Sequence, residues 1–142
     1  MYDFVKFRVA DVMTRSPISL RPEATLAEAQ QLFEQHGFNG LPVVDETGQL
    51  QGVVTKMDVL KAFTLRPEAI VPRYDDIMQH RVSEVMTHSP VSVSPETPCT
   101  RVLQRLVDMR IKSLPVVEDN RLVGVVARED VLSALREATN GG

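Results

Sequence analysis

The sequence predicts an α+β fold of two β-α-β-β-α repeats that pack sheet to sheet about a pseudo-two-fold axis. A block with the pattern LPVV, GVV and DVL occurs twice, over residues 41–60 and 114–132. An earlier block also occurs twice, as VADVMT from Val9 and VSEVMT from Val82. Repetition at a fixed spacing indicates a duplicated structural unit. A small sheet with one apolar face cannot bury that face alone, so the two copies are expected to cover each other.

The spacing between the copies locates a turn. Equivalent residues are 73 positions apart from Val9 through Val44, and 72 apart from Leu50 onward. One residue is therefore missing from the second copy, between residues 45–48 and 118–120. A surface hairpin tolerates such a deletion best, which predicts strand, turn and strand on either side of it.

Periodicity predicts the other elements of each repeat. Residues 18–20 and 91–93 alternate apolar and polar side chains, as short strands do. A helix with one apolar face follows each of them. The predicted core positions of these helices are Leu26, Ala29, Leu32 and Phe33 in the first copy, and Val102, Leu103, Leu106 and Val107 in the second. Gly37 is a predicted C-cap, and Arg110 takes its place in the second copy.

The last three elements of each repeat follow in the same order. The predicted strands are 41–44 and 50–55, then 114–117 and 122–127. The predicted final helices cover residues 56–65 and 128–138. In domain terms we expect an N-terminal extension (1–8), a first repeat (9–65), a connector (66–80) with a helical turn near Tyr74–Met78, a second repeat (81–138) and a disordered tail (139–142).

Composition argues against several functions. The net charge is −3, with no basic excess of the kind that nucleic-acid binding needs. No apolar run is long enough to span a membrane, and the N-terminal residues are too charged for a secretory signal, so we expect a cytoplasmic protein. Cys99 is the single cysteine and is expected in the core. The three histidines, His36, His80 and His88, lack metal-ligand spacing, and no catalytic motif is present. We therefore expect neither a metal nor an enzyme.

The repeated motifs resemble those of the CBS domain, in the tandem arrangement called a Bateman module. The motifs are V-x-[DE]-V-M-T-x-S-P, L-P-V-V and G-V-V-[TA]-x-x-D-V-L, and both copies carry all three. The resemblance covers residues 9–65 and 81–138 and implies a stand-alone CBS pair. It implies a regulatory module that needs no cofactor and binds AMP, ADP, ATP or S-adenosylmethionine between its repeats. It also implies a homodimer of pairs and a separate effector enzyme or transporter.

The resemblance assigns candidate ligand residues in both copies. In site 1, Asp58 would accept the ribose hydroxyls, Thr55 would donate to a phosphate, and Ile18, Leu41 and Pro42 would sandwich the base. The full set for site 1 is Thr14, Ser16, Pro17, Ile18, Asn39, Gly40, Leu41, Pro42, Thr55, Lys56 and Asp58. The set for site 2 is Thr87, Ser89, Pro90, Val91, Lys112, Ser113, Leu114, Pro115, Arg128 and Asp130.

A structural interpretation of the same residues competes with the functional one. Thr55 followed by Asp58 is also a capping box, which favours helix capping when these residues are considered alone. In the second copy Ala127 replaces the hydroxyl residue while Asp130 is retained. The retained acid favours ligand use, with Arg128 supplying charge in place of the hydroxyl. The missing hydroxyl favours the alternative, a structural dimerisation module without a physiological nucleotide.

Overall fold

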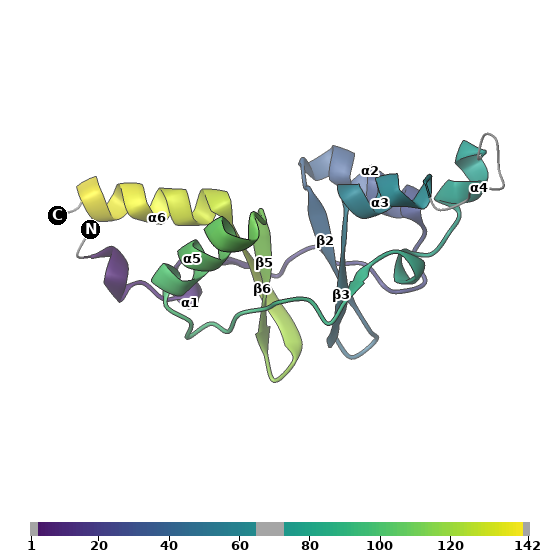
Figure 1. Cartoon of the computed structure of the whole chain (residues 1–142). Helices are drawn as coiled ribbons and strands as arrows, with labels where there is room; N and C mark the ends of the chain where they lie inside the picture. The colour runs from purple at the N-terminus through teal and green to yellow at the C-terminus, as the bar shows by residue number, and fades with distance from the viewer. Residues whose placement is uncertain (1–2, 65–72, 141–142) are drawn as a thin grey trace. The chain divides into compact units, whose positions relative to one another are not determined.

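The computed structural model describes residues 3–64 and 73–140 and confirms the mixed α+β class. The described residues form two sheets of three strands each, with helices beside both (Figure 1). The chain divides into two compact units, of which unit 1 comprises Met1–Pro17 and Val91–Gly142 and unit 2 comprises Ile18–Pro90. Most of the predicted connector, residues 66–72, lies outside the described residues.

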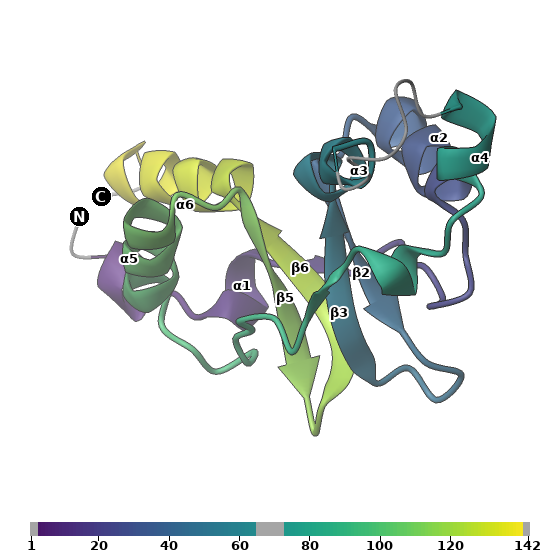
Figure 2. The same ribbon diagram turned by 45° about the vertical axis from the view of Figure 1, so that its right-hand side comes forward.

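Unit 2 contains the sheet β2-β3-β4. Strand β2 (Gly40–Val44) pairs antiparallel with β3 (Leu50–Thr55), and β4 (Thr87–His88) pairs with the other edge of β3. Its helices are α2 (Leu26–His36), α3 (Lys56–Ala62) and α4 (Tyr74–Met78), together with the 3-10 helix η2 (Val82–Glu84). Helix α2 contacts both α3 and α4, as Figure 2 shows. The predicted helical turn at Tyr74–Met78 is thus confirmed.

Unit 1 repeats this arrangement with the sheet β1-β6-β5. Strand β6 (Arg121–Ala127) lies between β5 (Ser113–Glu118) and β1 (Thr14–Arg15) and is antiparallel to both. The helices are η1 (Phe4–Lys6), α1 (Val9–Val12), α5 (Cys99–Met109) and α6 (Arg128–Asn140). Cys99 is fully buried in this core, as predicted. Burial, followed by the nearby charge of Asp11, raises the pKa of its thiol to about 11.

The third strand of each sheet differs from the prediction. Residues 18–20 and 91–93 form only single parallel bridges, Leu20 to Val43 and Val93 to Val116. The edge strand comes instead from the other repeat, because β4 pairs with β3 and β1 pairs with β6. The two sequence repeats therefore exchange their first strands.

The glycine of each G-V-V motif makes this exchange possible. A Cβ atom on Gly52 would lie 2.6 Å from the carbonyl oxygen of Thr87, and one on Gly124 would lie 2.7 Å from that of Thr14. Neither distance is sterically allowed. Only glycine can stand at these two positions while the V-M-T strand crosses them.

Residues of the predicted extension, and of the described part of the predicted connector, belong to the two cores. Phe4 is 1% exposed and Ile77 is 3% exposed, so each helps to fill the core of its unit. The backbone contacts of the two segments correspond as well. Cys99 N donates to Phe7 O at 3.0 Å, and Leu26 N donates to His80 O at 2.9 Å. Structural equivalence thus begins at Phe4 and Ile77, upstream of the repeat recognised in the sequence.

One prediction about the helices is confirmed and two are wrong. Gly37 caps α2 with φ of 67°, and Arg110 adopts the same left-handed conformation, with φ of 54°, after α5. Val107, predicted in the core, is 63% exposed, because the buried stripe of α5 runs through Cys99, Val102 and Leu106. Helix α6 continues to Asn140, so Thr139 and Asn140 are helical where a disordered tail was predicted.

The two hairpin turns account for the one-residue difference between the copies. The turn after β2 is organised by the Asp45 carboxylate, which accepts from Thr47 N at 2.9 Å and Gln49 N at 3.0 Å. Hydrogen bonds, first from the Thr47 side chain and then from the Gln49 backbone, lower the pKa of Asp45. The turn after β5 is shorter and places Asp119 and Asn120 at φ of 51° and 65°. Two consecutive left-handed residues are typical of a two-residue hairpin turn.

Candidate functional site

The candidate site of unit 2 lies where β3 ends and α3 begins. Thr55 is the N-cap of α3, and its Oγ1 accepts from Asp58 N at 3.2 Å. In return, Asp58 Oδ2 accepts from Thr55 N at 2.8 Å and from Thr55 Oγ1 at 3.0 Å. This reciprocal capping box confirms the structural interpretation of the pair.

The capping box does not use the whole carboxylate of Asp58. Its second oxygen, Oδ1, has no hydrogen-bond partner among the described residues. Asp58 is nonetheless only 8% exposed, and it is the one charged side chain that is buried within residues 3–64 and 73–140. The hydroxyl of Thr55 is already paired in both senses, because it accepts a hydrogen bond from the backbone of Asp58 and donates one to the Asp58 carboxylate. A phosphate contact from Thr55 would have to replace the donation to Asp58.

Four more predicted residues lie at the same end of the sheet. Gly40 pairs with Thr55, and Lys56 N donates to Asn39 O at 3.0 Å. Leu41 is 1% exposed and packs in the core of unit 2, so its side chain belongs to the core. Ile18 is more accessible, at 37% exposed. Unit 2 therefore brings the carboxylate of Asp58 and the backbone of Asn39, Gly40 and Lys56 close together.

Unit 1 has the equivalent arrangement without the hydroxyl. Ser113 pairs with Ala127, and Arg128 N donates to Lys112 O at 3.0 Å. The Asp130 carboxylate accepts from Ala127 N at 2.8 Å. Asp130 thus caps the start of α6, and this role accounts for its retention without a ligand. Burial and the neighbouring Glu129 raise the pKa of Asp130, against the opposing effect of the Ala127 N–H.

The guanidinium of Arg128 is partly engaged. Its Nε donates to the backbone oxygen of Ile111 at 3.1 Å, although the side chain is exposed. Val91, the counterpart of Ile18, is likewise 37% exposed, and Leu114 is buried at 1% like Leu41. The two units thus match in backbone pairing. They differ in the residue at positions 55 and 127, and in burial of the acid, since Asp58 is buried and Asp130 is half-buried.

The exchanged strands regroup the other predicted residues. Thr14 pairs with Val125, so Thr14, Ser16 and Pro17 belong to unit 1 with Asp130. Thr87 pairs with Val53, so Thr87, Ser89 and Pro90 belong to unit 2 with Asp58. Each predicted set therefore includes residues of both units. Sequence reasoning missed this regrouping, because two copies of one motif do not specify which copy an edge strand joins.

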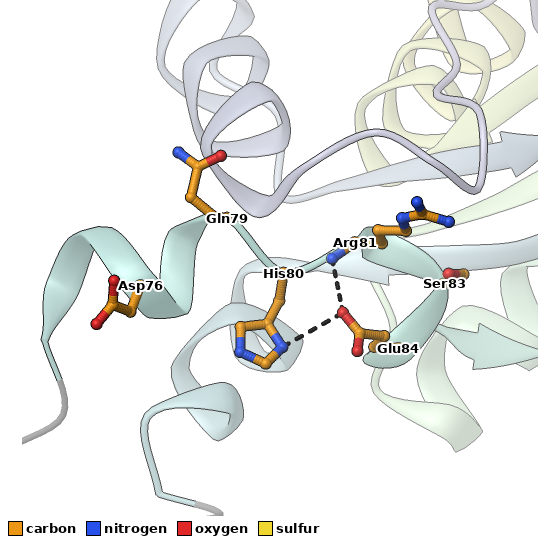
Figure 3. A pocket seen from close by; sticks show the side chains of 6 residues that line it. All are labelled: Asp76, Gln79, His80, Arg81, Ser83 and Glu84. Carbon is orange, nitrogen blue, oxygen red and sulfur yellow. Dashed lines mark hydrogen bonds and ion pairs between the residues drawn. The ribbon is translucent and has the colours of Figure 1, made fainter.

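An open pocket of about 600 Å³ lies elsewhere in unit 2, on the turn between α4 and η2. It is lined by Asp76, Gln79, His80, Arg81, Ser83 and Glu84, and it shares no residue with the predicted sites (Figure 3). Glu84 Oε2 accepts from Arg81 N at 2.8 Å and lies 3.3 Å from His80 Nδ1. The Arg81 N–H is the main cause that lowers the pKa of Glu84, with His80 contributing. These contacts make Glu84 a cap of η2. Both of its partners, Arg81 and His80, belong to the same turn.

Within 3–64 and 73–140, no three His, Cys, Asp or Glu side chains are grouped so that they could hold a metal ion. No helix in the same ranges has both the length and the apolar character to cross a membrane.

The model of the CBS domain matches residues 9–65 and 82–137 of the sequence. This chain belongs to the CBS-domain family. The CBS domain-containing protein YhcV of Bacillus subtilis is 33% identical over 123 residues, which are 87% of this chain and 81% of YhcV. Other relatives are much longer, and the chain spans only 22% of the L-aspartate semialdehyde sulfurtransferase of Methanocaldococcus jannaschii, at 30% identity over 87% of this chain.

Two solved CBS structures are similar over nearly the whole chain. CBSX2 in complex with AMP has a TM-score of 0.81 and 27% identity, over 94% of this chain and 98% of CBSX2. The CBS domain pair of protein MJ0100, in complex with 5′-methylthioadenosine and S-adenosyl-L-methionine, has a TM-score of 0.75 and 28% identity. That match covers 94% of this chain and 98% of the MJ0100 pair. The tandem CBS fold predicted from the motifs is confirmed.

Proposed function

We propose that this chain is a non-catalytic regulatory module of the cytoplasm that binds an adenosine-containing nucleotide. The candidate ligands are AMP, ADP, ATP and S-adenosylmethionine. The observation that carries the proposal is the similarity, over 94% of this chain, to two CBS pairs whose structures contain AMP in one case and S-adenosylmethionine with methylthioadenosine in the other. Those ligands share the adenosine group, so adenosine is the part that we assign to this chain.

The residues at the start of α3 suit such a ligand. Asp58 offers Oδ1 to the ribose hydroxyls while Oδ2 keeps the capping box intact. A buried carboxylate that accepts charge-assisted hydrogen bonds forms stronger contacts than an exposed one. Lys56 adds a positive charge for a phosphate next to Thr55. The exposed Ile18 supplies apolar surface for the base, and Thr14, Ser16 and Pro17 remain assigned to the same ligand.

The start of α6 is the weaker candidate. Asp130 is available in the same backbone setting, but Ala127 supplies no hydroxyl and Arg128 is tied to Ile111. Thr87, Ser89 and Pro90 remain assigned to this second ligand. We expect it to bind more weakly, or only as a nucleoside without phosphate.

Regulation requires that the ligand bind one conformation of the protein better than another. We propose that the nucleotide changes the arrangement of the CBS pair and that a separate effector, an enzyme or a transporter, responds to it. A homodimer of CBS pairs is part of the same proposal.

Thermal unfolding of the whole chain with AMP, ADP, ATP and S-adenosylmethionine tests nucleotide binding. A ligand at a hundred times its dissociation constant should stabilise the protein by about 2.7 kcal/mol. Asp58→Asn is the informative variant, because the amide oxygen can still accept from Thr55 N while the negative charge is lost. It should weaken ligand affinity at least tenfold, since hydrogen bonds to charged groups contribute about 1.5–3 kcal/mol. The thermal shift at a fixed ligand concentration should fall accordingly.

Asp130→Asn is the matched control and should leave the tighter binding event unchanged. Absence of a shift with all four ligands at millimolar concentration would contradict the proposal. An equal loss from the two variants would contradict our ranking of the sites.

The alternative is a structural dimerisation module without a nucleotide. One observation favours it, since both Asp58 and Asp130 already serve as helix caps and thereby account for the D-V-L motif. This alternative predicts normal folding and association with no nucleotide-dependent shift.

A further inference from the structure

Unit 1 is assembled from two separate pieces of chain, whereas unit 2 is continuous. Unit 2 is formed by Ile18–Pro90, and unit 1 by Met1–Pro17 together with Val91–Gly142. In Figure 2 the purple N-terminal segment accompanies the green and yellow elements of unit 1. A unit made of two pieces can be completed by pieces of two different molecules. Unit 1 is therefore the part of this protein that two copies of the chain can build together.

The contacts between the two pieces depend mainly on backbone. Val9 N donates to Thr97 O at 2.9 Å, and Ala10 N donates to Pro95 O at 2.8 Å. The side chain of Arg8 adds a bond from Nη1 to Glu96 O at 2.7 Å. Strand β1 covers one edge of β6. These bonds form in the same way whichever copy supplies residues 3–15.

The larger piece also needs this segment for its core. Phe4 is 1% exposed and Val9 is fully buried, in one cluster with Val93, Cys99 and other residues of the second piece. Without residues 3–15 the second piece would expose apolar surface and the edge of β6. Uncovered strand edges and apolar patches associate with other chains. Residues 3–15 are thus the segment of this chain that covers that edge and completes that core.

Both connections between the units are strained. The chain passes from one unit to the other after Pro17 and after Pro90. The residues before these prolines, Ser16 and Ser89, have φ of 52° and 48°. A left-handed conformation is unfavourable for a residue other than glycine, and a residue before proline prefers extended backbone. Strain at Ser16 favours exchange of residues 3–15 between molecules, because this connection opens on exchange and the opening relieves the strain, whereas the connection at Ser89 stays closed.

We propose that unit 1 is an exchange interface whose partner is a second copy of this chain. Residues 3–15 of each copy dock onto residues 91–140 of the other, so that two chains complete each other's unit 1 around a two-fold axis. Such a dimer differs from one formed by helix faces, because it can form or separate only when unit 1 opens. The proposal concerns folding and association alone and does not depend on nucleotide binding.

Native mass spectrometry of the full-length chain tests this exchange. Two preparations that differ only by an isotope label are either refolded together at high protein concentration or mixed after separate refolding. We expect mixed dimers after joint refolding, and none within hours of mixing folded proteins. Absence of a dimer in both experiments overturns the proposal, and so does a dimer that exchanges within the mixing time.

Variants of the two connections test which of them opens. Ser16→Gly removes the strain of the connection that opens when residues 3–15 move to the other copy, and it should lower the dimer fraction roughly threefold or more. Ser89→Gly is the matched control, because it relaxes a residue of similar φ in the connection that stays within one chain. The control should leave the dimer fraction unchanged. Equal effects of the two variants overturn the proposal.

Discussion

The starts of α3 and α6 occupy equivalent positions in the two units and differ in the capping residue, which is Thr55 in α3 and Ala127 in α6. In unit 2, Thr55 and Asp58 form a complete capping box. In unit 1, Ala127 cannot accept from the helix, and only Asp130 contributes, by accepting from Ala127 N at 2.8 Å. The comparison shows that the conserved spacing of the acid serves the helix in both units. The hydroxyl, which we propose for a phosphate contact, is present in unit 2 and absent from the equivalent position of unit 1.

The glycines of the two G-V-V motifs give the largest expected effect, because they decide whether each unit can form at all. Gly52→Ala places a Cβ atom 2.6 Å from Thr87 O and 2.8 Å from Met86 Sδ. Overpacking of this kind costs about 1–3 kcal/mol, and we expect the upper end because one neighbour is backbone. Gly124→Ala meets Thr14 O at 2.7 Å and should have a similar effect on unit 1.

Hydrogen exchange measured by mass spectrometry distinguishes the units. Gly52→Ala should weaken protection of peptides from Ile18–Pro90, and Gly124→Ala that of peptides from the two pieces of unit 1. Gly37→Ala is the control, because a Cβ there meets nothing within 4 Å although φ is +67°. It should cost about 1 kcal/mol. A cost from Gly52→Ala no larger than that from Gly37→Ala would contradict the crossing of strands described above.

The strand crossing at these glycines was not predictable from the sequence, although much of the fold was. The repeat, the hairpins and the α2 and α5 helices were predictable, because period-2 and period-3.6 patterns are local. The origin of the edge strands was not, since both copies of V-M-T can pair with either copy of G-V-V. The burial of Phe4 and Ile77 was missed for a related reason. These residues lie outside the matched motifs, and their equivalence appears only in the backbone bonds of Phe7 and His80.

The candidate site shows the same division. The residues that are neighbours through β2, β3 and α3 were predictable from the order of the motifs. Whether the acid of the D-V-L motif caps a helix or awaits a ligand was not, because one carboxylate has two oxygens and can do both. Asp58 uses one oxygen in the capping box.

Exchanging the residues at positions 55 and 127 sharpens the comparison of the helix starts. Thr55→Ala removes the acceptor for Asp58 N and should cost about 1 kcal/mol in the free energy of unfolding. Ala127→Thr offers α6 the hydroxyl that α3 has, and should return up to about 1 kcal/mol to unit 1. Chemical denaturation measures both. Destabilisation by Ala127→Thr would contradict the equivalence of the two positions. Val125→Thr is the control, because it adds a hydroxyl to the middle of β6, away from the helix start.

The smallest expected effect is a pH dependence of opposite sign at two capping carboxylates. Glu84 caps η2 in unit 2, and its pKa is lowered, chiefly by the Arg81 N–H. Its contribution to stability is present above the ordinary pKa of 4.5 and is lost as pH falls through the lower, folded value. Asp130 has a raised pKa in the folded protein, chiefly through burial. Its contribution is fully present below its ordinary value of 3.8 and is lost as pH rises through the folded value.

Melting temperatures of the wild type, Glu84→Gln and Asp130→Asn, measured from about pH 3 to about pH 6 so as to span the ordinary carboxyl pKa values, report these contributions. The advantage of the wild type over Glu84→Gln should grow as pH rises, because only the ionised Glu84 accepts strongly from Arg81 N. The advantage over Asp130→Asn should shrink across the same range, because ionised Asp130 is partly desolvated and lies near Glu129. Two differences of the same sign would show that burial at the start of α6 does not outweigh the Ala127 N–H bond. Asp130 would then stabilise unit 1 more in its ionised form than in its protonated form.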